Sequence, residues 1–155
     1  MKHTWLVGIL AGALLAGSAA VQAQQKPAAQ VPTGEVALGT ITLPRAVTAD
    51  GKPLPGGRYT LHLTAQAAQP TVAGQLPDLN RWVEFRQGGQ VKGREIASIV
   101  PAAEVSQTQA GPDLEAGKAP STGSKVELLK GGDYLRVWIS RQGTQFLIHL
   151  PLAGA

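Results

Sequence analysis

Apolar and polar residues alternate with a period of two through several short segments of the chain, and glycine or proline separates each segment from the next. The segment 133–141 shows this clearly, since Leu135, Val137 and Ile139 lie at every second position. Successive side chains of a β-strand point to opposite faces, so this pattern is typical of a strand with one buried face. No segment has an apolar stripe at helical spacing for more than about two turns. We therefore expect an all-β protein.

The alternation predicts seven or eight short strands. Their ranges are 35–43, 58–66, 81–87, 90–99, 125–130, 133–141 and 144–151, with a short additional strand near 46–49. This number of short strands, separated by turns, predicts an antiparallel sandwich of two packed sheets. An outer-membrane barrel would instead need strands of roughly 9–11 residues and two aromatic girdles, and the chain has few aromatic residues.

Glycines mark the expected turns. Gly88-Gly89 and Gly131-Gly132 supply the left-handed backbone positions that tight hairpins require. Pro55-Gly56 suits the central pair of a type II turn. Within 35–43 the apolar phase slips by one residue, and a β-bulge or bend is therefore expected near Gly39.

The N-terminus has the three parts of a secretory signal peptide. Lys2 provides a basic start, an apolar run spans residues 5–20, and Val21-Gln22-Ala23 forms a small-residue cleavage site. The run is shorter than the roughly 20 residues of a spanning helix, and an uncleaved membrane anchor is the alternative. We expect a signal peptide over residues 1–23 and a periplasmic or secreted product with no membrane span after cleavage.

The remaining chain is long enough for one domain with its own core. Residues 24–34 lack periodicity and are expected to form a flexible leader. A single domain is expected over residues 35–155, with a long polar loop at about 101–124. A loop of this length in a compact domain is either functional or disordered.

Composition excludes several kinds of chemistry. The chain has no cysteine, which excludes thiolate metal sites, thiol catalysis and disulfides. The net charge is +4, and it falls to +3 if Lys2 is removed. The basic residues are scattered, whereas nucleic-acid-binding proteins gather them on one face. No nucleic-acid partner is therefore expected.

No catalytic, metal or cofactor motif is present. His62 and His149 lie on the polar phase of predicted strands, where solvent-exposed side chains are ordinary. If their strands were neighbours they could offer two metal nitrogens, but zinc or copper usually needs a third protein ligand. Carboxylates are sparse and scattered, which gives no support to a paired glycosidase site. We predict no catalytic residue, no metal site and no cofactor.

Aromatic and arginine side chains share the polar phase of two predicted strands. Trp82 and Arg86 lie on one strand, and Arg136 and Trp138 on another. They could form an exposed platform, where rings stack on sugars or peptide side chains and arginines hold anionic groups. Alternatively, this phase faces a second sheet, so that the tryptophans are core residues with arginines stacked over them.

One segment reads Ala49-Asp50-Gly51-Lys52-Pro53-Leu54-Pro55-Gly56-Gly57-Arg58-Tyr59-Thr60-Leu61. It resembles a sequence motif of extracytoplasmic bacterial β-sandwich modules of the prealbumin-like and immunoglobulin-like kinds. The resemblance covers a turn and the start of a strand, and it implies a fold rather than an activity. The whole chain also resembles small exported proteins of Gram-negative bacteria to which no chemistry is assigned.

These features together predict a non-enzymatic exported protein. It would serve as a binding or structural accessory module of the cell envelope, with an envelope protein, peptidoglycan or a polysaccharide as its partner. The alternative is an envelope hydrolase or lyase with a diffuse active site.

Overall fold

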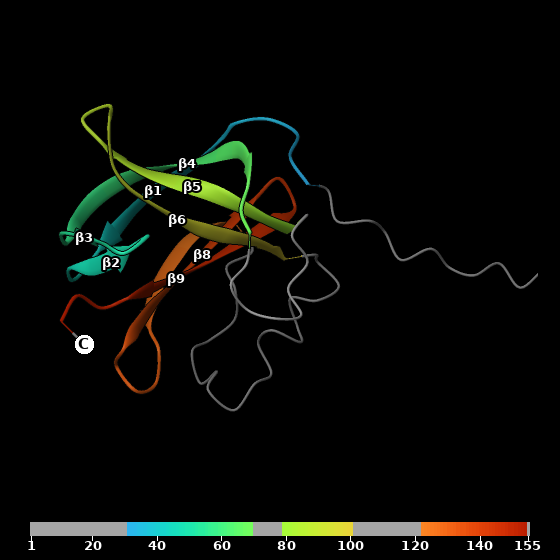
Figure 1. The fold of residues 1–155 in the computed structure, drawn as a ribbon. Coiled ribbons are helices and arrows are strands. Elements are labelled where there is room, and N and C mark those ends of the chain that lie inside the picture. The colour runs from blue at the N-terminus through green and yellow to red at the C-terminus, as the bar shows by residue number, and fades with distance from the viewer. Residues whose placement is uncertain (1–30, 70–78, 101–121, 155) are drawn as a thin grey trace, which may run out of the picture.

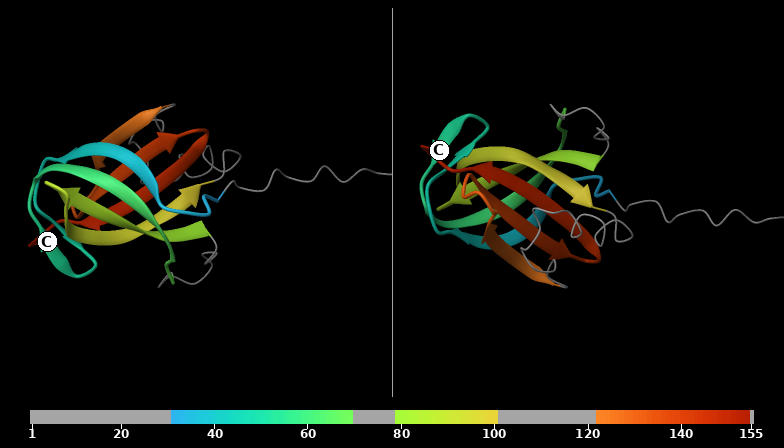
Figure 2. Two further views of the ribbon diagram at one scale, coloured as in Figure 1. Left: turned by 90° about the horizontal axis from the view of Figure 1, so that it is seen from above. Right: turned by 90° about the horizontal axis from the view of Figure 1, so that it is seen from below.

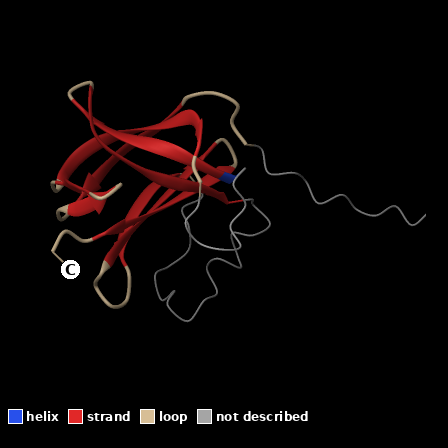
Figure 3. Cartoon of the chain, viewed as in Figure 1, coloured by secondary structure: helices blue, strands red, loops and turns tan. Residues whose placement is uncertain are grey.

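Seven antiparallel strands form one continuous sheet, and two short strands form a separate hairpin (Figure 1). The computed structural model describes residues 31–69, 79–100 and 122–154. Nearly all of these residues belong to strands or to the loops that join them (Figure 3). The strands are β1 (Val36–Leu43), β2 (Val47–Ala49), β3 (Lys52–Leu54), β4 (Gly57–Ala67), β5 (Asn80–Gln87), β6 (Gln90–Val100), β7 (Gly123–Leu128), β8 (Tyr134–Arg141) and β9 (Thr144–Pro151).

The large sheet is curled almost into a barrel (Figure 2). Its strand order is β1-β4-β5-β6-β9-β8-β7, and the curl brings the edge strands β1 and β7 beside each other. Across this seam the hydroxyl of Ser124 donates a hydrogen bond to the carbonyl oxygen of Thr40 at 3.3 Å. No ladder pairing joins β1 to β7 within the described residues. Neighbours alternate in direction along the seven strands, so the two edge strands run parallel to each other.

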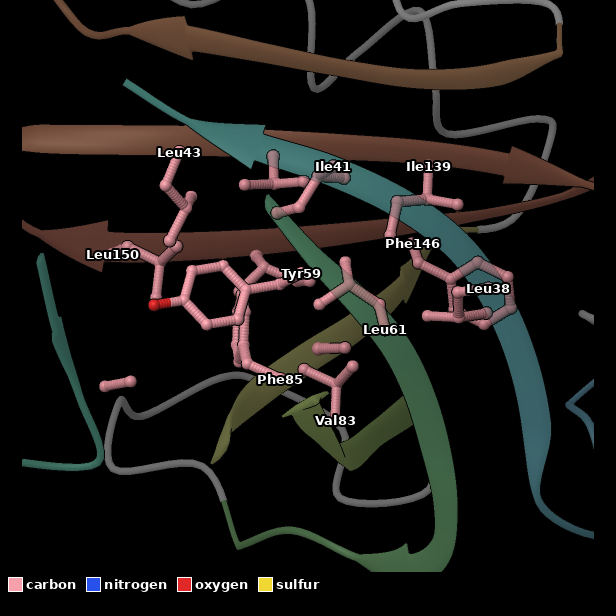
Figure 4. Close-up of a cluster of buried hydrophobic side chains, with 14 of the residues drawn as sticks. Leu38, Ile41, Leu43, Tyr59, Leu61, Val83, Phe85, Ile139, Phe146 and Leu150 are labelled. Atoms are coloured by element: carbon pink, nitrogen blue, oxygen red, sulfur yellow. The ribbon is translucent and has the colours of Figure 1, made fainter. Parts of the chain in front are cut away.

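The inside of the curled sheet is filled by side chains (Figure 4). Alternate residues of each long strand point inward, as the period-two pattern requires. Tyr59 and Phe85 meet edge to face in this core, with ring centroids 6.1 Å apart, and the Tyr59 hydroxyl donates to the Pro55 carbonyl oxygen at 2.8 Å. The β2–β3 hairpin contributes Val47, Ala49 and Leu54 to this core, and the large sheet contributes Leu38, Ile41, Leu43, Tyr59, Leu61, Leu63, Val83, Phe85, Ala97, Ile99, Leu135, Val137, Ile139, Phe146, Ile148 and Leu150.

The β2–β3 hairpin fills a gap in the wall of the barrel. β6 pairs with β9 only over its last four residues, Ala97–Val100, so its first half is not joined to β9. The hairpin packs against that half, and an added Cβ at Gly93 would lie 3.3 Å from a methyl carbon of Leu54 and 3.4 Å from the Cβ of Ala49. Glycine at position 93 therefore lets the hairpin approach β6 closely.

The prediction of an all-β, antiparallel fold is confirmed, and each predicted strand agrees closely with an observed one. The strands, however, form one curled seven-stranded sheet rather than two packed sheets. The bulge expected near Gly39 is confirmed, because the β1–β4 register shifts between Ala37 and Gly39, where φ is 121°. Bulges bend a strand and increase its twist, which helps a single sheet to close around its own core.

Two local expectations were wrong. The β3 strand was missed, and Asp50-Gly51 forms the tight turn before it, with φ of 47° and 73°. Gly56 does not adopt the left-handed conformation expected of a type II turn. Glycine is instead needed at position 56 because the backbone of Arg45 passes close to it. A Cβ there would lie 3.2 Å from the carbonyl carbon of Arg45.

The predicted signal peptide (1–23) and most of the predicted leader (24–34) and long loop (101–124) lie outside the described residues. Within the described part of the chain, no helix is long and apolar enough to span a membrane.

Candidate binding site

The four predicted surface residues all lie on the outer face of the curled sheet, but in two separate places. Trp82 and Arg86 belong to β5, whereas Arg136 and Trp138 belong to β8 (Figure 1). Strands β6 and β9 lie between β5 and β8 in the sheet. The fold therefore does not bring the two pairs together into one platform.

The β5 position is partly exposed and carries a stacked cation. The guanidinium carbon of Arg94, on β6, lies 4.3 Å from the ring centroid of Trp82, within the range of a cation–π interaction. The Nε–H of Arg94 donates to a carboxylate oxygen of Asp50 at 2.8 Å. Asp50 is in the turn of the β2–β3 hairpin, so this arginine links the hairpin to the aromatic ring.

Arg86 is paired with a neighbour on its own strand. Its Nε and one terminal nitrogen donate to the same carboxylate oxygen of Glu84, at 2.9 and 2.6 Å. The two residues are two positions apart on β5 and so point to the same face. Both side chains remain partly exposed, at 30% for Arg86 and 24% for Glu84, which leaves a salt-bridged pair beside Trp82 at the surface.

A β-bulge places Arg94 on this face. Phe85 pairs with Gly93 and Arg86 with Val91, so Lys92 is an extra residue in β6. Without that residue the count from the Gly88-Gly89 turn would put Arg94 opposite Val83, on the inner face. Sequence reasoning missed Arg94 for this reason, because the periodicity of β6 alone does not reveal the bulge.

Next to Arg94 lies a shallow hollow of about 180 Å³ between the hairpin and the start of β6. Its charged lining consists of Lys52, Lys92, Arg94 and Asp50. Lys92 donates to the side-chain oxygen of Gln90 at 2.9 Å, and no hydrogen bond or ion pair engages Lys52 within the described residues. Cations thus outnumber acids among the residues that line this hollow, and neither lysine was singled out from the sequence.

The β8 position is buried. Trp138 has no exposed surface, and Arg136 is 2% exposed. Both donate to one carboxylate oxygen of Glu127 on β7: Arg136 from Nε at 2.8 Å and from a terminal nitrogen at 2.5 Å, and Trp138 from its indole nitrogen at 3.2 Å. Lys125 binds the other oxygen at 2.6 Å. This part agrees with the interpretation of Trp138 as a packed residue with an arginine beside it.

The donors around Glu127 keep it ionised. Burial alone would raise the pKa of this carboxyl, but hydrogen bonds and positive charge from Lys125 and Arg136 outweigh burial and lower the pKa below its ordinary value. Both carboxylate oxygens are already engaged. A general acid needs a proton to donate, so the arrangement suits a fixed counter-charge better than a catalytic acid.

His149 extends this row of side chains. Glu127 pairs with Arg136 across β7 and β8, and Arg136 pairs with His149 across β8 and β9. Partial desolvation by the surrounding chain and the positive charge of Arg136 lower the pKa of His149, although its ring keeps access to solvent. Arg136 and His149 are directly opposite each other, as cross-strand neighbours on one face of the sheet.

The two histidines singled out from the sequence do not come together. His62 is on β4 and His149 is on β9, with β5 and β6 between them in the sheet. Among the residues that the structure describes, no group of three or more histidine or carboxylate side chains could hold a metal ion.

A larger hollow of about 300 Å³ lies at the other end of the barrel, next to the β8–β9 turn. Apolar Val36 and Phe146 line it together with Arg141, its single charged residue. Size favours this hollow, whereas the gathering of an aromatic ring and several cations favours the surface around Trp82 and Arg94. We rank the second higher because recognition of a polar ligand depends on such groups.

Comparison with known proteins gives no further guide, since no family model, curated protein or solved structure matches this chain.

Proposed function

We propose that the chain is a non-enzymatic, exported binding module of the cell envelope, and that it binds a polysaccharide or peptidoglycan strand. The Trp82–Arg94 pair on the outer face of β5 and β6 is the observation that supports this proposal. The pair is partly exposed, held at 4.3 Å, and fixed to the hairpin through Asp50.

A stacked indole and guanidinium offer two kinds of contact. The uncovered part of the indole can pack against the apolar face of a sugar ring, and the arginine can hold an oxygen-bearing group nearby. Because Asp50 orients Arg94, little side-chain freedom remains to be lost when a ligand binds. The filled barrel interior leaves the outer surface as the place where a polymer can be accommodated.

The hydrolase or lyase alternative has less support from the described residues. Glu127 is the most enclosed carboxylate outside the barrel interior, but its oxygens are engaged by three neighbouring side chains. Glu84 is engaged by Arg86. A glycoside hydrolase needs two carboxyl groups facing a common bond, and these two are on β7 and β5, on different parts of the sheet.

The proposal is tested by co-sedimentation of the purified chain with insoluble peptidoglycan and with insoluble envelope polysaccharide. We expect the wild-type chain to pellet with one of them, and Trp82→Ala to bind at least tenfold more weakly. Arg141→Ala, at the opposite end of the barrel, is the matched control and should bind like wild type.

Two results would overturn the proposal. One is that wild type and Trp82→Ala pellet equally with the polymer. The other is that the chain catalytically releases soluble sugar from the polymer, which would show that it is an enzyme. Thermal unfolding of each variant separates a loss of binding from a loss of fold.

A further inference from the structure

We infer that the hollow between the β2–β3 hairpin and β6 is an anion subsite that takes a phosphomonoester group of the bound glycan. This inference rests on the proposed function, because the hollow adjoins Arg94 of the Trp82–Arg94 pair. It assigns a chemical class of ligand to a place defined by Lys52, Lys92 and Arg94.

Two structural elements, β3 and β6, deliver these cations to one place. Lys52 begins β3 directly after the Asp50-Gly51 turn, Lys92 is the extra residue of the β6 bulge, and Arg94 follows two positions later. The bulge matters because it leaves Lys92 without a partner in the ladder and brings Arg94 to the outer face, and both residues line the hollow. Close packing of the hairpin on Gly93 then sets the distance between the two sides of the hollow.

The charge balance favours a dianion. Three cations line the hollow, and Asp50 is the single acid among its lining residues. Two further carboxylates adjoin this place. Glu84, directly opposite Arg94 on β5, is paired with Arg86, and Glu95, on the inner phase of β6, accepts backbone N–H groups of Asp50 at 2.8 Å and of Ile96 at 2.9 Å. A phosphomonoester carries a charge of about −1.5 to −2 at neutral pH, so three cations attract it more strongly than they attract a singly charged carboxylate.

Donor geometry agrees with this assignment. Asp50 occupies the Nε–H of Arg94, and the terminal nitrogens of Arg94 have no other hydrogen-bond partner in the described residues. Lysine ammonium groups bind phosphate as point charges, and arginine adds directed N–H donors. The hollow of about 180 Å³ is open to solvent, so a phosphate attached to a sugar could enter it while the sugar lies toward Trp82.

The test is to titrate the purified chain with three probes at matched ionic strength: inorganic phosphate, glucose 6-phosphate and glucose. Binding is monitored through the chemical shifts of the backbone amides. We expect both phosphates to shift the amides of residues 50–52 and 91–94. Glucose 6-phosphate should also shift the indole N–H of Trp82 and should bind more tightly than phosphate.

Lys52→Ala/Lys92→Ala is the test variant. We expect it to bind glucose 6-phosphate about tenfold more weakly, since each exposed ionic contact contributes modestly. Arg141→Ala, which alters a cation outside the hollow, should bind as wild type does. Both lysines are exposed, and an unchanged thermal midpoint will show that the double variant is folded.

The outcomes separate the two proposals. If phosphate shifts no amide near the hollow, or if the double variant binds as wild type does, the anion subsite is overturned, while polymer binding through Trp82 stands or fails on co-sedimentation alone. If phosphate and glucose 6-phosphate bind equally and Trp82 does not respond, the anion subsite is supported as a site for free phosphate, and the glycan assignment is overturned.

Discussion

Arg136 and Glu127 form an enclosed ion pair on the outside of a barrel-like sheet, with Arg136 Nε 2.8 Å from Glu127 Oε1. Removing two charges from water is costly unless each finds partners. Here Glu127 also accepts the indole N–H of Trp138 and the ammonium of Lys125. The cluster joins β7, an edge strand of the large sheet, to β8.

Breaking this pair should destabilise the fold strongly. Arg136→Ala is expected to lower the free energy of unfolding by about 3 kcal/mol, because it leaves an enclosed carboxylate with fewer donors. The double variant Glu127→Leu/Arg136→Met should lose clearly less, since neither charge is left behind. Urea denaturation measures both, and an equal loss in the single and double variants would contradict the idea that the unpaired charge is the main cost.

Stability should decline in two stages as the pH falls. The pKa of folded His149 is lowered, so the unfolded chain takes up its proton first, near the ordinary value of 6.5, and stability falls from there until the folded histidine also titrates. The pKa of folded Glu127 is lowered from 4.5, so its contribution is complete above that value and is lost as the pH passes through the folded pKa. In His149→Gln, the decline that begins near pH 6.5 should flatten, as followed by unfolding midpoints.

Trp82 and Trp138 should differ in accessibility when they are compared in a chain that lacks residues 1–23 and so lacks Trp5. Trp138 is fully buried and Trp82 is partly exposed. Trp138→Phe, which leaves Trp82, should emit at longer wavelength and be quenched readily by acrylamide, whereas Trp82→Phe should be quenched weakly. Similar quenching constants for the two variants would contradict the burial of Trp138.

Gly93 should tolerate no larger residue while Leu54 faces it. In Gly93→Ala the new methyl group would lie 3.3 Å from a Leu54 methyl carbon, and we expect a loss of about 1–2 kcal/mol from this overpacking. Leu54→Ala removes a buried side chain and is destabilising by itself, but in that background Gly93→Ala should cost less, so that the two changes are not additive. Additive losses in a double-mutant cycle of denaturation curves would show that the contact is not the cause.

Replacing Gln142 with glycine should stabilise the fold. It lies in the β8–β9 turn with a φ of 51°, a left-handed conformation that costs a side-chain-bearing residue about 1–2 kcal/mol. Gln142→Gly is expected to raise the free energy of unfolding by about 0.5–1 kcal/mol after the added flexibility of the unfolded chain is subtracted. Gln142→Ala keeps the unfavourable φ and should leave stability nearly unchanged.

The strands and the β1 bulge could be predicted because their signal is local. Alternation marks each strand, and the phase slip around Gly39 marks the extra residue. The number of sheets could not be predicted this way, since alternation shows that one face of a strand is buried but not whether the covering side chains come from another sheet or from the same one. Here the inner faces of all seven strands cover one another.

Predicting the site would have required the pairing register between strands, and that register cannot be read from a single sequence. Trp82 was found because aromatic residues on a polar phase stand out, but its partner Arg94 was not, because the bulge at Lys92 reverses which residues of β6 face outward. Glu127 was likewise missed as the partner of Arg136, since the two are nine positions apart on strands whose pairing fixes their contact. Lys52 depended on a strand that was not predicted.

The seam between β1 and β7 has a consequence for motion. Seven is an odd number, so the edges that meet there run parallel, and within the described residues a side-chain hydrogen bond from Ser124 to Thr40 takes the place of a ladder. The sheet can thus part along this line without breaking any interstrand backbone hydrogen bond. Amide hydrogens that face the seam should exchange with solvent sooner than those of β5 and β6, which makes this line the natural starting point for local unfolding.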